Sequence, residues 1–67
     1  MRVACIKDGV VINVIEVTDL NNIPDIVAVD ENGNFVTKEQ VKIIETSTGS
    51  AGDIYIEGKG FFRFAGV

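Results

Sequence analysis

The chain has 67 residues, of which 46% are hydrophobic, ten are acidic, six are basic, one is cysteine and none is histidine. A formal net charge of −4 has the wrong sign for neutralising phosphates, so we expect no nucleic-acid partner. A single cysteine allows no intrachain disulfide, and without histidine the chain lacks the commonest ligand of zinc and copper sites, so we expect no metal and no cofactor.

The size of the chain predicts one domain, spanning residues 1–67, with little interior. A domain of roughly 60 residues buries only about 60% of the surface that its unfolded chain exposes. Natural domains of this size add disulfides, a metal or oligomerisation, and only oligomerisation is left here, so we expect a homo-oligomer or another protein partner. No apolar run approaches the ~20 residues of a membrane span, and the first residues lack the apolar core of a secretory signal, so we expect no membrane partner and residence in the cytoplasm.

Residues 6–17, IKDGVVINVIEV, predict a β-hairpin. Asp8-Gly9 lies between two apolar runs and favours a type I′ turn, because both central residues of that turn need positive φ. A two-residue loop pairs Lys7 with Val10, Ile6 with Val11, Cys5 with Ile12, Ala4 with Asn13 and Val3 with Val14. In this register both faces of the second strand are apolar, which is typical of a strand buried on both sides.

The surplus apolar surface of this hairpin predicts contact with another chain, since disulfide, metal and membrane offer it no other partner. Asn13 interrupts the apolar strand, and a buried amide without hydrogen bonds costs roughly 1 to 3 kcal/mol. Its partner is either a neighbouring backbone or loop, or a group across a subunit interface. The predicted interface residues are Val11, Asn13, Ile15, Val17, Tyr55 and Phe62, with the opposite face of the strand as the alternative.

The middle of the chain predicts a loop and then a second hairpin. Residues 19–25, DLNNIPD, contain the only proline, which cannot donate to a strand ladder, so we expect a loop. Asn32-Gly33 is a second preferred type I′ pair. It sets Glu31 opposite Asn34 and Val29 opposite Val36.

Residues 37–45, TKEQVKIIE, leave two structures open. Thr37 with Gln40 matches a capping box, which favours one or two helical turns. The β-branched valine and isoleucines that follow favour a strand.

The last third of the chain predicts a flexible loop of small residues, 46–52, followed by a third hairpin over residues 53–64. The turn of this hairpin lies within residues 57–60, where either Gly58-Lys59 or Lys59-Gly60 forms the central pair. Four of the five aromatic side chains lie here and bring the largest apolar area per residue: Tyr55, Phe61, Phe62 and Phe64.

Three candidate chemical sites are weak. Residues 30–41, DENGNFVTKEQV, match the first ligand positions of an EF-hand loop, but Phe35 stands where glycine is needed and Val41 where a bidentate glutamate is needed, which favours a plain hairpin. Cys5 has no histidine to activate it and is expected to be a small buried hydrophobe. The loop TSTGSAGD, 46–53, has the composition of an anion-binding nest but lacks the phosphate-loop motif. We therefore expect no catalytic residues and no enzyme.

Two stretches, CIKDGVVINVIEV (5–17) and AGDIYIEGKGFF (51–62), resemble small proteins and terminal modules that many tailed bacteriophages encode near their tail and tail-fibre genes. The first stretch matches an A-x-I-x-D-G-V-V-x-N-V-I-like strand pair through Ile6, Asp8, Gly9, Val10, Val11, Asn13, Val14 and Ile15. The second matches a G-x-x-Y-D-G-x-x-F-like segment through Gly52, Tyr55, Gly58 and a following Phe. It departs from that pattern at Ile56-Glu57, and the tryptophan often found nearby is absent.

The resemblance implies a non-enzymatic virion component, or a module associated with a tail, fibre or head, that works through protein contacts in the virion or the host cytoplasm. An acidic β-domain with surplus apolar strand surface also suits docking better than catalysis. The alternative is a small intracellular phage or bacterial protein that binds an anionic ligand or a host factor as an oligomer. This alternative would use the loop at residues 46–53 and the cations Lys38, Lys42, Lys59 and Arg63.

The predicted fold is all-β: a small antiparallel meander or partly closed barrel of five or six strands, with or without one short helical turn near residues 38–43.

Overall fold

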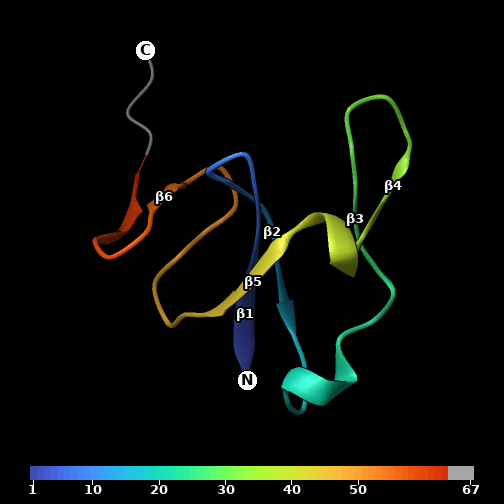
Figure 1. Ribbon diagram of the computed structural model, residues 1–67, viewed down its shortest axis with the longest axis horizontal. Coiled ribbons are helices and arrows are strands. Elements are labelled where there is room, and N and C mark those ends of the chain that lie inside the picture. Colours follow the sequence, from blue (N-terminus) through green and yellow to red (C-terminus); the bar gives the residue numbers. More distant parts are fainter. Residues whose placement is uncertain (64–67) are drawn as a thin grey trace.

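The computed structural model describes residues 1–63 and is built from β-strands joined by tight turns and by longer loops (Figure 1). Its elements are β1 (Arg2–Lys7), β2 (Val10–Glu16), the 3-10 turn η1 (Leu20–Asn22), β3 (Ile26–Val29), β4 (Phe35–Thr37), the 3-10 turn η2 (Lys38–Gln40), β5 (Lys42–Glu45), β6 (Ile54–Ile56) and β7 (Gly60–Phe62). Five strands form one antiparallel sheet in the order β5-β1-β2-β6-β7, which curves into a half-barrel, and β3 and β4 form a separate hairpin. The predicted all-β, partly closed fold is confirmed. Phe64, assigned to the third hairpin from the sequence, lies outside the described residues.

The first hairpin turns at Asp8-Gly9, as its sequence predicts. Asp8 has a φ of 53° and Gly9 a φ of 79°, so both central residues occupy the left-handed region that a type I′ turn requires. Aspartate and glycine are among the few residue types that adopt this conformation at low cost. The pairing of Ile6 with Val11 follows from this turn.

Beyond Ile6 the predicted register is wrong, because β2 contains a β-bulge. Ile12 is an extra residue on β2, so the pairs that follow are Cys5 with Asn13, Ala4 with Val14 and Val3 with Ile15. A bulge moves every later side chain of its strand to the other face. Val14 therefore joins Val11 on the concave face of the half-barrel, while Ile15 lies on the convex face with Ile12.

The second hairpin turns over three residues and not over the predicted two. Gly33 N donates to Asp30 O at 3.0 Å, and Asp30 N donates to Asn34 O at 2.9 Å. Of the turn residues only Gly33 has a positive φ, 82°, which makes this a type I turn closed by a glycine bulge. Asp30 supports the turn through Oδ1, which accepts hydrogen bonds from the backbone N of Asn32 and Asn34.

This turn sets a register that differs from the predicted one. Val29 pairs with Phe35 and Ala28 with Val36, which leaves Val27 as an extra residue in β3. Val36 is buried against the five-stranded sheet, so the neighbouring pair of Val29 and Phe35 points away from it. The expected pairing of Val29 with Val36 is wrong, and so is the expected pairing of Glu31 with Asn34.

The turn between β6 and β7 lies within the predicted residues, 57–60, but its central pair is Glu57-Gly58. Lys59 N donates to Ile56 O at 2.9 Å, and Gly58 has a φ of 81°, as a type II turn requires. Neither of the two central pairs left open by the sequence is the one present.

Both structures left open for residues 37–45 are present, one after the other. In η2 the side chain of Gln40 accepts a hydrogen bond from Thr37 N at 2.9 Å, and β5 follows directly. The predicted loop at residues 19–25 contains η1, which Asp19 caps by accepting from Asn21 N at 2.7 Å.

Two apolar clusters cover opposite faces of β1 and β2. The inner cluster, on the concave face, consists of Ala4, Ile6 and Val11 with Val14, Ile44, Tyr55 and Phe61. The outer cluster, on the convex face under the β3–β4 hairpin, consists of Cys5, Val27 and Val36 with Ile12, Ile15, Ile23, Ala28, Val41 and Ile43. Because both faces of β1 are covered, Val3, Ala4 and Cys5 have 0% exposure.

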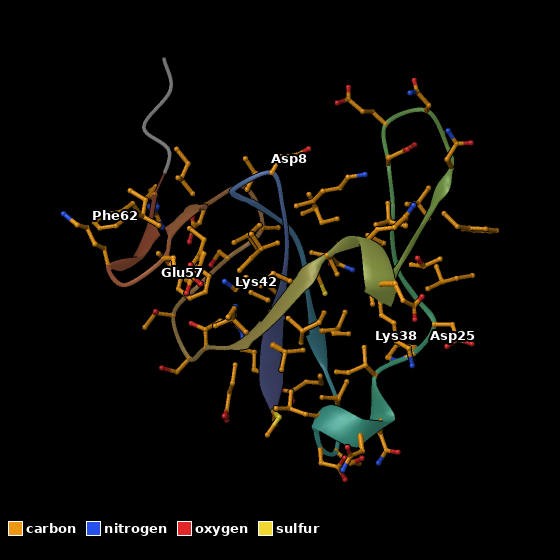
Figure 2. All side chains as sticks on the ribbon, viewed as in Figure 1. Asp8, Asp25, Lys38, Lys42, Glu57 and Phe62 are labelled. Atoms are coloured by element: carbon orange, nitrogen blue, oxygen red, sulfur yellow. The ribbon has the colours of Figure 1, made fainter. Side chains whose placement is uncertain are left out.

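An ion pair links the edge strand β5 to the β6–β7 hairpin at the other side of the sheet (Figure 2). Lys42 Nζ bonds Glu57 Oε1 and lies 5.7 Å from the centroid of the Tyr55 ring. The ring of Tyr55 in turn packs against Phe61 with centroids 5.0 Å apart. The hydrogen bond between the two charged groups raises the pKa of Lys42 and lowers the pKa of Glu57.

Candidate interaction surfaces

Asn13 lies where the two irregular strands meet, and its amide is bonded within the chain. Its Nδ2 donates to Val27 O at 2.7 Å, and its Oδ1 accepts from Val14 N at 2.9 Å. Val27 is the extra residue of β3, and Asn13 directly follows the extra residue of β2. Of the two partners considered for this amide, a neighbouring backbone is the one that the fold supplies.

The six residues predicted as an interface do not form one surface. Val11 is 1% exposed at the centre of the inner cluster, and Tyr55 packs against the same cluster. Ile15 packs in the outer cluster, and Val17 is half-buried just beyond β2. Phe62 is exposed on β7. Contact of these residues with another chain stays a prediction, and Phe62 is the most exposed of the six.

Phe62 belongs to a group of apolar side chains on the convex face, beyond the reach of the β3–β4 hairpin. Val10 pairs with Ile54 and Ile54 pairs with Phe62, so these three side chains point to the same side of the sheet. Ile56, two residues along β6 from Ile54, points the same way. Val10, Ile56 and Phe62 are 40%, 46% and 47% exposed. We call Val10, Ile54, Ile56 and Phe62 the apolar strip.

A second exposed apolar group lies on the β3–β4 hairpin. Val29 and Phe35 are cross-strand partners that are 59% and 67% exposed, next to the turn that carries Asp30 and Glu31. Figure 1 shows this hairpin and the β6–β7 hairpin at opposite ends of the long axis of the molecule.

Sequence reasoning missed both groups except for Phe62. The available signal was the period of two along each strand, which shows which side chains share a face once the turn is known. With a three-residue turn in DENGN, Val29 and Phe35 pair with each other and point to the face opposite to that of the buried Val36. A two-residue turn would instead pair Val29 with Val36 and place both on the same face.

The loop at residues 46–53 uses its backbone amides within the chain. Thr46 Oγ1 accepts hydrogen bonds from the N of Thr48 at 3.1 Å and of Gly49 at 2.9 Å. Ser50 N donates to Asp53 Oδ2 at 2.9 Å. An anion-binding nest needs such amides to point into an open concavity. Here they are already bonded, so this loop gives an anion little to bind.

Two of the four cations considered for an anionic ligand are paired with carboxylates. Lys38 Nζ lies 3.5 Å from Asp25 Oδ1, and Lys42 is bonded to Glu57 (Figure 2). A shallow depression beside the loop is lined by Arg2, Glu45, Thr46 and Ser47. In it the guanidinium of Arg2 donates to Thr46 O at 3.3 Å.

Chemically reactive groups are sparse in the part of the chain that the structure describes. Cys5 is buried, and burial raises the pKa of its thiol, which disfavours the reactive thiolate. Within residues 1–63, no group of three or more carboxylates or thiols is placed to hold a metal ion. Over the same residues, no helix has the length and apolar character needed to cross a membrane.

Comparison with protein-family models, with curated proteins and with solved structures gives no match to this chain. A function is therefore inferred from the exposed surfaces themselves.

Proposed function

We propose that the chain is a non-enzymatic interaction module of a phage-like particle, either a virion component or a protein associated with the tail, fibre or head, that acts through protein–protein contacts. The apolar strip carries this proposal. It joins an aromatic side chain, Phe62, to three aliphatic ones on a small acidic surface, and exposed apolar groups of this kind mark sites of protein contact.

The position of the strip in the sheet supports docking. The strip ends on β7, which pairs only with β6 among the described strands and so offers backbone groups along its outer edge. A partner strand can add to such an edge while its side chains cover the apolar residues beside it. Phenylalanine is enriched at the centres of interfaces, which makes Phe62 the expected anchor.

The turn carboxylates support a non-enzymatic role. Asp19, Asp30 and Asp53 each accept hydrogen bonds from backbone amides of their own turns, which are structural duties. The buried Cys5 thiol has no histidine to activate it.

Mass spectrometry of purified particles tests the proposal, using the phage or induced prophage that carries the gene. The wild-type chain is expected to copurify with particles, and Phe62→Ser to reduce its amount at least about tenfold, because loss of an interface anchor costs about 1.4 kcal/mol or more. Leu20→Ser is the matched control, since Leu20 is also an exposed apolar residue but lies on η1, away from the strip. Absence of the wild-type chain from particles would contradict the proposal.

A further inference from the structure

We infer that the protein associates with further copies of itself head to tail, with the β3–β4 hairpin of one copy bound to the β6–β7 hairpin of the next. The inference rests on the proposed function, and it names a partner for the apolar strip: a second copy of this chain.

The two hairpins carry opposite charge. Asp30 and Glu31 are exposed in the β3–β4 turn, whereas Lys59 is exposed in the β6–β7 turn and Arg63 directly follows β7. None of these four forms a salt bridge with another residue among 1–63. Residues 19–39 carry five carboxylates and one lysine, while residues 54–63 carry two cations and a single carboxylate, which is paired with Lys42.

Each hairpin also presents exposed apolar side chains beside its charges. On the β3–β4 hairpin these are Val29 and Phe35, and on the β6–β7 hairpin they are Ile56 and Phe62. Contact between the hairpins of two copies covers both phenylalanines, which supply large apolar areas for burial. The same contact sets carboxylates against cations, which favours this pairing over others.

The placement of the hairpins gives each copy two different binding ends. They lie at opposite ends of a molecule whose longest Cα extent is 33 Å (Figure 1). A two-fold contact between like hairpins would set carboxylates against carboxylates, or Lys59 against its own copy, and like charges oppose such a contact. A contact between unlike surfaces repeats from copy to copy and closes a ring or extends a filament.

Sedimentation velocity with two variants tests the pairing, because each variant removes one end and keeps the other. The wild-type chain is expected to show an average mass that rises with concentration above the 7.2 kDa of the monomer. Phe35→Ser and Phe62→Ser are each expected to associate about tenfold more weakly. A 1:1 mixture retains one intact interface and is expected to form a dimer that does not grow further. Leu20→Ser is expected to associate like the wild type.

Charge reversal in the two turns gives a second test that keeps the apolar residues. Glu31→Lys and Lys59→Glu change exposed turn positions, and each is expected to weaken association. The double variant restores opposite charges with the signs exchanged, so it is expected to regain association. Far-UV circular dichroism checks that every variant keeps the fold.

Several results would overturn the inference: a wild-type chain that stays monomeric at every concentration, a mixture that recovers nothing, or a Phe35→Ser variant that associates like the wild type. A Phe35→Ser variant that associates like the wild type would indicate a two-fold contact through the β6–β7 hairpin. Incorporation into particles is measured in a separate experiment. A monomeric chain found in purified particles overturns self-association and leaves the proposed function standing. A chain that self-associates but is absent from particles overturns the proposed function and leaves self-association standing.

Discussion

Asn13 is the side chain that connects the two sheets. The bulge in β2 and the bulge in β3 each leave backbone groups outside the regular ladders, and such groups need other partners when they are buried. Asn13 bonds both strands at once, Val27 O through its Nδ2 and Val14 N through its Oδ1. A polar residue in an apolar strand therefore has a structural duty that an apolar one cannot perform.

We expect Asn13→Ala to lower the free energy of unfolding by about 1 to 3 kcal/mol, because it leaves partly buried backbone groups without partners. Denaturant-induced unfolding measures the change. Asn34→Ala is the matched control, since Asn34 is exposed and its side chain makes no hydrogen bond with the other described residues. The control is expected to stay within about 0.5 kcal/mol of the wild type. An equal loss in both variants would contradict the bridging role.

Gly49 shows how closely the loop at residues 46–53 packs on the third hairpin. A Cβ at this position would lie 2.8 Å from Cδ1 and 2.9 Å from Cε1 of Phe61. Phe61 packs in the inner cluster beside Tyr55, so its ring has little room to move.

Gly49→Ala is expected to lower the free energy of unfolding by about 1 to 3 kcal/mol through overpacking. The exposed neighbour provides the control, Ser50→Ala, which is expected to unfold at nearly the wild-type denaturant concentration. If Gly49→Ala also unfolds at the wild-type denaturant concentration, the Phe61 ring moves aside without a loss of stability and the close packing is not a constraint.

Among the strands and turns, the sequence predicts those features that neighbouring residues determine. Asp8-Gly9 specifies its turn because both residues tolerate positive φ. The bulge at Ile12 could not be predicted in this way, since both faces of β2 are apolar and a one-residue slip exposes nothing new. What fixes it is the bond from Asn13 to Val27, a residue 14 positions away in the sequence.

The candidate surfaces were predicted less completely than the fold for a similar reason. Phe62, named from its aromatic hairpin, is exposed on β7, whereas Val11, Ile15 and Tyr55, proposed with it, lie in or against the two clusters. Which apolar side chains stay exposed depends on where the β3–β4 hairpin covers the sheet. That placement is a tertiary contact, and no local pattern in the sequence encodes it.

The ion pair between β5 and the β6–β7 hairpin predicts a pH dependence of stability. The hydrogen bond from Lys42 lowers the pKa of Glu57 in the folded state. The contribution of this ion pair to stability is therefore fully present above the ordinary glutamate pKa of about 4.3. It is lost as the pH falls through the lowered value. On the alkaline side the pKa of Lys42 is raised, so the contribution is lost only as the pH rises through that raised value.

Glu57→Gln is expected to lower Tm slightly at neutral pH, and the difference is expected to disappear in acid, well below about pH 4. The effect is small because both side chains are exposed and water screens them, and added salt should reduce it further. Thermal unfolding over a pH series measures it, with Glu39→Gln as the control at an exposed carboxylate that has no ion-pair partner among residues 1–63. A Tm difference that persists unchanged in acid would contradict the electrostatic origin.

The fold as a unit contains two small apolar clusters that lie back to back on β1 and β2. The curved sheet closes the inner cluster through Tyr55 and Phe61, and the β3–β4 hairpin closes the outer one through Val27 and Val36. This explains how so short a chain covers a strand that is apolar on both faces: its own two hairpins supply one cover each. Neither cluster can be lost without exposing one face of the shared strands.

Labelling of Cys5 with a thiol reagent tests whether the two clusters unfold together. The thiol is fully buried and burial raises its pKa, so we expect it to react only in opened molecules, in proportion to their population. Val11→Ala in the inner cluster and Val36→Ala in the outer cluster delete the same groups, at a cost of about 2 kcal/mol each. If the molecule is one cooperative unit, both variants speed labelling by the same factor, roughly 30-fold. Leu20→Ala, at an exposed position on η1, should leave the rate unchanged. Acceleration by Val36→Ala without a matching effect of Val11→Ala would show instead that the β3–β4 hairpin lifts from the sheet by itself.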